Sequence, residues 1–306
     1  MPLQTPSNAL EPSLRDSIDT VAAESNDPPR IVSLSDIHGY LAEARSALLT
    51  LADHPETEPV VIADKDGRLH WADNNYVLVF NGDLVDRGPE NEAVLALVGR
   101  LIREAPPGRV RVTLGNHEAI MLARDQFGLS EWYSGRVDDA ERRQYCEAII
   151  RGYVVAAYEG YSVTYAHAGS TEPYDVPAVN QSLVSAATAL TDAIGTDEDT
   201  TVQRRLSERY PVVLGVGERH LKGPDAGLIW LDFEHLAANA PPQVVGHTRH
   251  TTPRTKGSVH CQNVIRETLD AAGGEAVFVE TAADLTALVR RSDGGVETQP
   301  LSSAIC

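Results

Sequence analysis

The sequence predicts an α/β protein in which two mixed β-sheets pack together and are flanked by helices. Three observations favour this fold class. Apolar runs of strand length alternate with stretches of helical periodicity, further strand-like runs around glycine turns follow residue 257, and 42% of the 306 residues are hydrophobic, enough for one large core. The sequence contains no internal repeat and indicates no second domain.

The first half of the chain predicts alternating strands and helices. A strand at residues 30–35 leads into an amphipathic helix at 40–53, in which apolar side chains recur at helical spacing. Apolar runs at 60–62 and 69–71 flank an Asp-Lys-Asp-Gly turn and predict an inserted hairpin. A second helix is expected at 89–105, with a proline in its first turn and Pro-Pro-Gly after its end.

The second half is less regular. After residue 118 the pattern is helical to about residue 157. Residues 170–223 are rich in Ala, Thr, Asp and Glu and predict helical segments, which we expect to form a cap over the functional site of the protein. Four later runs predict successive antiparallel strands, at 259–261, 275–279, 285–289 and 296–298. Residues 1–29 lack an apolar centre and predict a flexible acidic tail, so the folded domain is expected to span 30–300.

The composition limits the classes of partner and compartment. The chain has 44 acidic and 26 basic residues, a net charge of −18, and only three lysines. This charge repels nucleic acid phosphates and anionic membranes, and no apolar run reaches the length of a membrane span. Three widely spaced cysteines argue against a disulfide framework and favour a reducing cytoplasm. The acid-rich, lysine-poor balance is typical of salt-loving microbes; an acidic protein from a high-GC genome is the alternative.

Five polar motifs end or follow apolar runs, in the order Asp36-Ile37-His38-Gly39, Gly82-Asp83-Leu84-Val85-Asp86-Arg87-Gly88, Gly115-Asn116-His117-Glu118, His167-Ala168-Gly169 and Gly246-His247-Thr248. Ends of buried strands are where α/β sheets build their sites. Asp, His and Asn are the residue types that hold a pair of mid-row divalent metals without thiolate. Each motif alone also fits a capped turn or a hydrogen-bonded core histidine, but their joint occurrence predicts a dinuclear metal site.

Together the motifs resemble those of the calcineurin-like metallophosphoesterases and, within them, the phosphoprotein phosphatase branch, over about residues 30–250. The strings at 82–88 and 115–118 are the most specific. The resemblance implies the four-layer metallophosphatase fold and a phosphatase that hydrolyses phosphomonoesters by in-line attack of a metal-bridging hydroxide on phosphorus. It also implies two divalent ions, with Mn²⁺ expected and Fe or Zn as alternatives.

The resemblance assigns the metal ligands residue by residue. Asp36 and His38 would bind one ion, Asp83 would bridge both ions, and the second ion would be completed by Asn116, His167 and His247. A bridging carboxylate suits this role because it holds two cations ~4 Å apart against their repulsion.

Three further residues are expected to act in catalysis. His117 is the expected general acid for the leaving alkoxide, because imidazole exchanges protons near pH 7. Asp86 would hold the other ring nitrogen of His117, the role that family members give to the matching residue. Arg87 would grip phosphate oxygens with its planar guanidinium.

Departures from the family bear on the substrate. Protein phosphatases of eukaryotic type usually have His-Gly-Gly in place of residues 167–169, Arg in place of Leu114, and a Ser-Ala-Pro-Asn-Tyr-Cys string that this chain lacks. These differences favour microbial relatives, including Shewanella-like phosphatases and symmetrical diadenosine tetraphosphatases. The substrate is therefore a phosphorylated protein or small phosphoester or, alternatively, a dinucleoside tetraphosphate. A non-catalytic regulator that senses metal or nucleotide is a third reading, against which the intact His117 argues.

The second substrate arginine of the family has no clear counterpart in the sequence. Arg219 is one candidate, and Arg249 is close enough to the last motif to reach a phosphate, with a solvated side chain as its alternative. The expected cap also carries acidic residues at 192–199 and the pair Arg204 and Arg205. The sign of the charge that faces the site would therefore decide between phosphoprotein and dinucleotide.

Overall fold

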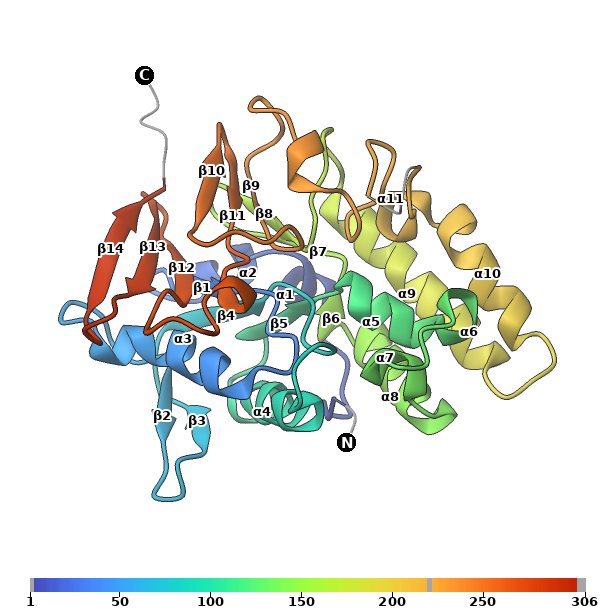
Figure 1. Cartoon of the computed structure of the whole chain (residues 1–306), viewed down its shortest axis with the longest axis horizontal. Coiled ribbons are helices and arrows are strands. Elements are labelled where there is room, and N and C mark those ends of the chain that lie inside the picture. Colours follow the sequence, from blue (N-terminus) through green and yellow to red (C-terminus); the bar gives the residue numbers. More distant parts are fainter. Residues whose placement is uncertain (1–2, 219–221, 302–306) are drawn as a thin grey trace.

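The computed structural model describes residues 3–218 and 222–301. Its strands form two large sheets and a separate hairpin (Figure 1). The larger sheet has seven strands in the order β14-β13-β12-β1-β4-β5-β6, and the smaller has five in the order β10-β11-β9-β8-β7. Both sheets contain parallel and antiparallel pairs. Helices flank the paired sheets, so the predicted fold class is confirmed.

The elements have the following bounds. The larger sheet comprises β1 (Arg30–Leu34), β4 (Tyr76–Phe80), β5 (Val110–Thr113), β6 (Val154–Val155), β12 (Ala276–Glu280), β13 (Leu285–Arg290) and β14 (Val296–Pro300). The smaller sheet comprises β7 (Ala157–Glu159), β8 (Thr164–Ala166), β9 (Gln243–Val245), β10 (Arg254–Lys256) and β11 (Val259–Cys261), and the hairpin is β2 (Val61–Ala63) and β3 (Leu69–Trp71). The helices are α1 (Pro12–Asp16), α2 (Asp19–Ala23), α3 (Leu41–Asp53), α4 (Asn91–Glu104), α5 (Asn116–Leu122), α6 (Arg124–Phe127), α7 (Tyr133–Arg136), α8 (Asp139–Ile150), α9 (Val176–Ala193), α10 (Asp199–Arg209) and α11 (Pro211–Leu214), with 3-10 turns η1 (Phe233–His235) and η2 (Ile265–Glu267).

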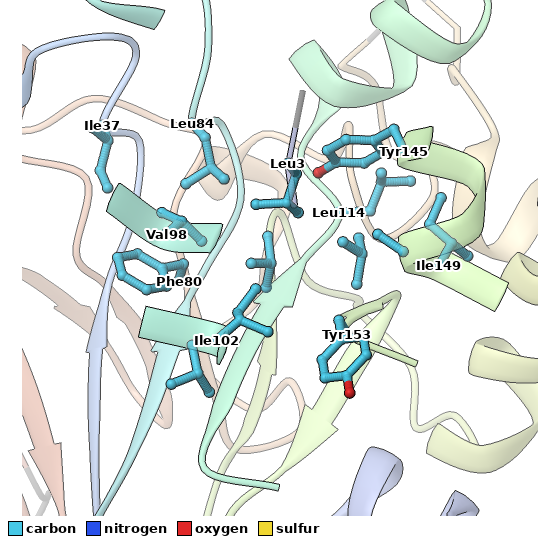
Figure 2. Packing of buried hydrophobic residues seen from close by; sticks show 14 of the residues in the cluster. Leu3, Ile37, Phe80, Leu84, Val98, Ile102, Leu114, Tyr145, Ile149 and Tyr153 are labelled. Atoms are coloured by element: carbon cyan, nitrogen blue, oxygen red, sulfur yellow. The ribbon is translucent and has the colours of Figure 1, made fainter. Parts of the chain in front are cut away.

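Successive residues of β4 serve two different cores, because side chains alternate between the faces of a sheet. Val77 and Val79 belong to the apolar cluster that joins the two sheets, together with Val244 of β9. Phe80 belongs to the cluster on the opposite face, where it lies with Val98 and Ile102 of α4 (Figure 2). A strand that is buried on both faces requires the continuous apolar run that predicted it.

Several predicted elements are confirmed. The helix expected at 40–53 is α3, the helix expected at 89–105 is α4, and the hairpin is β2 with β3. The C-terminal strands β12, β13 and β14 form an antiparallel meander as expected. However, β11 is not part of this run, because it pairs with β9 and β10 in the smaller sheet.

The helical stretch expected up to residue 157 is broken. It contains α5, α6, α7 and α8, and then the strands β6 and β7. Gly128 ends α6 with a left-handed backbone, φ 64°, and the Asp138 side chain caps α8 by accepting a hydrogen bond from the Glu141 N–H. These local stop and start signals interrupt a pattern that periodicity alone read as continuous.

The prediction of a flexible tail at residues 1–29 is wrong for its described part. Residues 3–29 contain α1 and α2, and Leu3 and Ile18 are fully buried. The buried Arg111 side chain donates hydrogen bonds to the Leu14 and Arg15 carbonyls, and Asn180 of α9 donates to Asp16. The segment lacks apolar periodicity, so only its tertiary contacts reveal that it is packed.

The expected helical character of residues 170–223 agrees with α9, α10 and α11, which lie side by side on one flank of the molecule (Figure 1). In the described part of the chain, no helix combines the length and the apolarity that crossing a membrane requires.

Candidate active site

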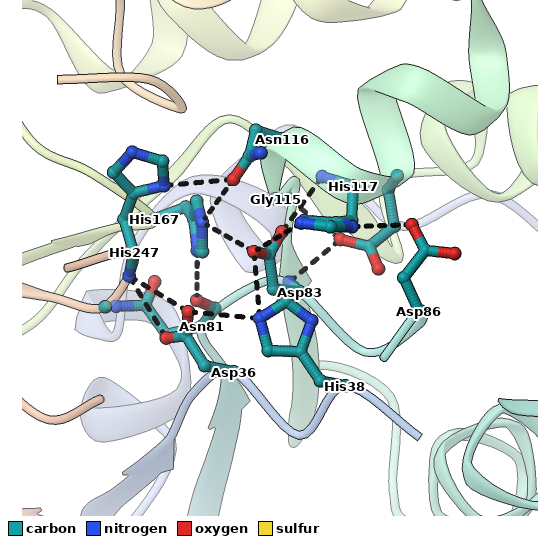
Figure 3. A network of polar contacts seen from close by, with 12 residues as sticks. Asp36, His38, Asn81, Asp83, Asp86, Gly115, Asn116, His117, His167 and His247 are labelled. Carbon is teal, nitrogen blue, oxygen red and sulfur yellow. Dashed lines mark hydrogen bonds and ion pairs between the residues drawn. The ribbon is translucent and has the colours of Figure 1, made fainter. Parts of the chain in front are cut away.

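The five polar motifs meet at one place in the fold. Asp36 and His38 follow β1, Asp83 follows β4, Asn116 and His117 open α5 after β5, and His167 and His247 follow β8 and β9. Because β1, β4 and β5 are parallel in one sheet and β8 and β9 are parallel in the other, their carboxyl ends face the same side. Figure 3 shows the resulting cluster, with Asp83 at its centre.

The backbone at the site is unusual. In the described chain, six residues other than glycine have a positive φ, between 49° and 73°, and all six belong to the predicted site: Asp36, His38, Asp83, Asp86, Arg87 and His247. Such conformations cost about 1–3 kcal/mol each and persist only where the surroundings enforce them. Their concentration here marks these loops as the place where stability is given up for side-chain geometry.

The first donor group surrounds His38. Its Nε2 lies 3.4 Å from Asp83 Oδ2 and 3.8 Å from Asp36 Oδ1. His117 Nε2 lies 3.9 Å from the same Asp83 oxygen, so His38, Asp83 and His117 could also surround one cation.

The second donor group shares the central carboxylate. His167 Nε2 lies 3.4 Å from Asp83 Oδ2 and 3.1 Å from Asn116 Oδ1, and His247 Nδ1 lies 2.9 Å from that amide oxygen. The donor atoms of Asp83, His167 and His247 lie close enough together to hold an ion. The structure therefore brings all six predicted ligands together, with Asp83 common to both groups.

Backbone carbonyls orient two of the imidazoles. His38 Nδ1 lies 3.0 Å from the Val85 carbonyl, and His167 Nδ1 lies 2.9 Å from the Asn81 carbonyl. A carbonyl only accepts hydrogen bonds, so each Nδ1 carries a proton and each Nε2 is the ring atom that faces the cluster. This tautomer is the one that binds metals through Nε2.

Burial shifts the pKa values of Asp36 and His38, whereas the neighbouring Asp83 raises the pKa of His167 to about 9 against the effect of burial. Burial raises the pKa of Asp36 to about 7, and it lowers the pKa of His38 to about 3, because in each case the charged form loses its hydration. A divalent cation stabilises the ionised carboxylate and the neutral imidazole, which are the ligating forms. The donor set of oxygen and nitrogen atoms without thiolate thus fits a pair of mid-row divalent ions.

Two buried polar residues that sequence reasoning did not assign hold these loops. Glu118 accepts hydrogen bonds from the N–H groups of Asp83, Leu84, Val85 and Gly115. Asn81 donates to carbonyls of β8 and β9 and accepts from Thr113 of β5, so it joins the two sheets beneath the site. Glu118 ends the third motif and could have been found there, whereas Asn81 carried no sequence signal.

His117 and Asp86 form a hydrogen-bonded pair at the edge of the cluster. His117 Nδ1 lies 2.5 Å from Asp86 Oδ2, and Ser134 donates to both Asp86 oxygens through its N–H, 2.8 Å, and its hydroxyl, 2.7 Å. Burial alone would raise the pKa of Asp86, but the hydrogen bonds from His117 and Ser134 hold it below its usual value. Asp86 is therefore an ionised acceptor that fixes the His117 ring.

The cluster opens into a cavity of about 430 Å³. His38, Asp83, Asn116, His117 and His247 form part of its wall, and its cationic lining comes from Arg87, Lys222, Arg249 and Arg266. Apolar and aromatic side chains complete it: Ile120, Phe127, Leu129, Trp132 and Trp230. Arg266, on η2, was missed because it follows no motif and reaches the cavity only through tertiary folding.

The expected cap does not lie where it was predicted. Of the described residues in 170–223, Lys222 lines the cavity, whereas α9 packs against α8, and α10 packs against α9 and α6. Arg204 and Arg205 are exposed on α10 and do not line the cavity. Arg249 does line it and pairs with Glu267 at 2.9 Å, while Arg219 lies outside the described residues. The lining above the cluster comes mainly from the α5–α7 region and from residues after 222.

Comparisons with known proteins agree with this geometry. The family model for calcineurin-like phosphoesterases matches residues 29–278. Shewanella-like protein phosphatase 2 of Arabidopsis thaliana is 30% identical over 100 residues, which are 32% of this chain and 23% of that protein. The chain thus matches less than a quarter of that relative's length.

Two solved structures cover nearly the whole chain. A point mutant of a cold-active protein tyrosine phosphatase has a TM-score of 0.58 at 19% identity, over 98% of this chain and 83% of that one. The cold-active protein-tyrosine phosphatase of a psychrophilic Shewanella species has a TM-score of 0.52 at 18% identity, with the same coverage. At this level of identity the two structures show a shared fold.

Proposed function

Because the chain belongs to the calcineurin-like phosphoesterase family and is therefore a hydrolase, we propose that it is a metal-dependent phosphatase that hydrolyses phosphomonoesters of phosphorylated proteins or small molecules. The observation that carries this proposal is the shared cavity. Members of both donor groups, among them the shared Asp83, line one cavity together with His117 and four cationic side chains. The net charge of the whole chain is −18. Local positive charge against that background suits an anionic substrate.

We propose that Asp36, His38 and Asp83 hold one divalent ion, and that Asp83, Asn116, His167 and His247 hold the other. Mn²⁺ is the proposed metal, because mixed carboxylate, amide and imidazole donors suit a mid-row ion. Two such ions, when bound, clamp a phosphate and activate water for attack on phosphorus. The family implies divalent ions, and the donor groups described above could hold them.

His117 is the proposed proton donor to the leaving oxygen. Its Nδ1 is engaged by Asp86, so Nε2, on the cavity side and 3.9 Å from Asp83 Oδ2, is the atom that would deliver the proton. The ionised Asp86 stabilises the imidazolium before the transfer and fixes the direction of the ring.

Arg87 and Arg266 are the proposed phosphate grip. Both line the cavity. The pKa of Arg87 is lowered first by partial burial and second by repulsion from the charge of Arg266. Two guanidinium groups close enough to repel each other gain stability when a phosphate dianion binds between them.

Compartment and salt preference are also proposed. Cys146 and Cys261 are buried free thiols, as expected of a protein in a reducing cytoplasm. The excess of acidic residues and the three lysines support a protein adapted to high salt, and the negative charge speaks against a nucleic acid partner.

A dinucleoside tetraphosphate is the second candidate substrate. A neighbouring hollow of about 500 Å³ shares Lys222, His247 and Arg249 with the cavity, so further phosphates would meet positive charge there. Asp232 and Glu267 line the same hollow and oppose that charge. This balance favours the monoester and leaves the dinucleotide as a defined alternative.

A substrate panel tests the proposal. The Mn²⁺-loaded chain is assayed with phosphoseryl, phosphothreonyl and phosphotyrosyl peptides, an aryl phosphate and diadenosine tetraphosphate, with Asp83→Asn as the control for contaminating phosphatase. We expect phosphate release from the aryl phosphate and at least one peptide, and none from the control. Turnover confined to diadenosine tetraphosphate would replace the proposal by its alternative, and no turnover of any substrate would refute both.

A further inference from the structure

The helix α7 and the residue before it contact three of the proposed catalytic residues. Trp132 and Ser134, which we call the α7 clamp, reach Arg87, His117 and Asp86. Neither residue lies in a polar motif, and three helices and a strand, α4, β5, α5 and α6, lie between the second motif and α7 in the chain.

The face of the Trp132 ring contacts the guanidinium group of Arg87. The guanidinium carbon of Arg87 lies 3.9 Å from the centre of the Trp132 ring, well within the range of a cation–π contact. An aromatic face attracts the guanidinium charge without offering an oxygen acceptor to its N–H groups, so those donors stay available to a phosphate. A carboxylate partner would instead compete with the phosphate for the same N–H groups. Trp132 thus restrains a long, exposed side chain without consuming its donors.

The same indole packs on the proposed acid. The rings of His117 and Trp132 are stacked, with centroids 4.9 Å apart and planes 18° from parallel, and His38 meets His117 edge-on at 4.7 Å. Ser134 acts on His117 indirectly, because its N–H and hydroxyl both donate to the Asp86 carboxylate that holds the His117 ring. The clamp therefore fixes the ring from its face and from its hydrogen-bond partner.

The clamp is itself held rigidly. Ser134 is fully buried, and the backbone N–H of Trp132 donates to the Leu129 carbonyl at 3.1 Å. Gly135 packs so tightly that a Cβ there would lie 2.0 Å from the Leu129 carbonyl oxygen, so no other residue fits without moving the turn. A rigid support suits side chains that must stay in place during a reaction.

We propose that Trp132 and Ser134 are positioning residues for phosphoester hydrolysis: Trp132 presents Arg87 to the phosphate and, with Ser134, aims His117 at the leaving oxygen. The inference rests on the proposed function. The two roles can be measured separately. Arg87 acts on phosphate affinity with every substrate, whereas the contribution of His117 to kcat is largest when the leaving group is a poor one.

The test measures kcat and KM of the Mn²⁺-loaded protein with an aryl phosphate and an alkyl phosphate. Trp132→Leu removes the ring, and we expect kcat/KM to fall by about 5- to 30-fold, with a higher KM on both substrates and a larger loss of kcat on the alkyl phosphate. Trp132→Phe should restore most of the loss, because a phenyl face also attracts guanidinium. Trp71→Leu makes the same change in β3, away from the site, and should leave both constants unaltered.

Ser134→Ala sharpens the assignment. It removes one hydroxyl donor and keeps the backbone donor, so we expect about a tenfold loss of kcat on the alkyl phosphate with little change in KM. Ser185→Ala, an exposed serine of α9, is the matched control. In an Arg87→Leu background, Trp132→Leu should no longer raise KM, because contacting residues are not additive.

Constants within about twofold of the parent for both Trp132→Leu and Ser134→Ala would overturn the inference, as would losses that add fully in the Arg87→Leu background. Melting temperatures identify a variant that fails to fold, and in that case Trp132→Phe and Ser134→Ala decide. Calorimetric titration with inorganic phosphate gives a readout without turnover, in which Trp132→Leu should bind more weakly than Trp71→Leu. A parent that binds phosphate through Trp132 but turns over no substrate would refute the proposed function and the role of His117, and would leave only the placement of Arg87 by Trp132 standing.

Discussion

Two regions of the molecule bury charged side chains, and they treat them differently. Between α8 and α10, Arg142 and Asp199 form a bidentate pair, with N–O distances of 2.6 Å and 2.8 Å, and Gln203 adds a further hydrogen bond to Asp199. At the strand ends, Asp36 and Asp83 face histidines and have no arginine or lysine within ion-pair distance in the described chain.

The pKa values of two aspartates express this difference. The hydrogen bond from Arg142 lowers the pKa of Asp199 to about 2, whereas burial raises the pKa of Asp36 to about 7. A buried charge that serves the fold is neutralised within the chain. Among the described residues Asp36 has no such partner, and it lies on a backbone held in a left-handed conformation, which is what we expect of the metal ligand proposed above and not of a structural ion pair.

The largest expected effect comes from removing the shared ligand. Asp83→Asn should lower turnover by about 10³-fold or more, because metals supply several kcal/mol of transition-state stabilisation and each 1.4 kcal/mol is tenfold. Bound metal, measured by elemental analysis, should fall as well, while the circular dichroism spectrum stays that of the parent. A variant that retains two ions and near-normal turnover would show that Asp83 does not join the two donor groups.

The next effect concerns the proposed acid. His117→Asn should cost about 10²- to 10⁴-fold in kcat on an alkyl phosphate, the usual range for general acids, and less on an aryl phosphate, whose leaving group needs little protonation. Kinetics with both substrates check this. Equal losses on the two would assign His117 to metal binding, in the group that it can form with His38 and Asp83.

Breaking the buried ion pair of Arg142 and Asp199 should lower the stability of the fold and leave turnover unchanged. Asp199→Ala leaves Arg142 buried without its main partner, so we expect the free energy of unfolding to fall by about 3 kcal/mol, with Asp139 at 3.3 Å limiting the loss. Urea unfolding measures this, and turnover at a temperature where the variant is folded should match the parent. A loss of metal or turnover in the folded variant would erase the distinction between the two regions.

The pH dependence of stability tests the role of the ionised Asp199 in the buried ion pair. Because the folded-state pKa of Asp199, about 2, lies below its ordinary value of 3.8, its stabilising contribution is present above about pH 4 and is lost as the pH falls through 2. The difference in unfolding free energy between the parent and Asp199→Asn should therefore shrink from pH 4 to pH 2. A constant difference across that range would mean that the ionised carboxylate does not supply the stability.

The smallest expected effect is that of salt on stability, which differs between exposed and buried charges. Repulsion among exposed acids reaches about 30 Å at 0.01 M salt and 3 Å at 1 M, so the melting temperature should rise by several degrees between about 0.1 M and 2 M KCl. The stability lost in Asp199→Ala should be nearly independent of salt, because buried pairs are weakly screened. A melting temperature that stays flat or falls would remove the high-salt interpretation.

By itself the sequence determined the elements whose signals are local. The apolar run of β4, the helical spacing of α3 and the turn of the β2–β3 hairpin are read from neighbouring residues, and so were the polar residues that end each strand. The position of five polar motifs at strand ends predicted one shared site, and the resemblance to the family named the six ligands within it. Their family resemblance supplied the order and the roles.

Only the tertiary structure decided what depends on residues far apart in the chain. It buried Leu3 and Ile18 in a segment without periodicity, placed Arg266 in the cavity, and set Trp132 against Arg87 and His117. It also turned the acids and arginines near α10 away from the cavity, closing Asp199 onto Arg142. The physical reason is that a charge or a ring has no role until its partner is fixed, and those partners are brought together by packing of the sheets and helices, which no local pattern records.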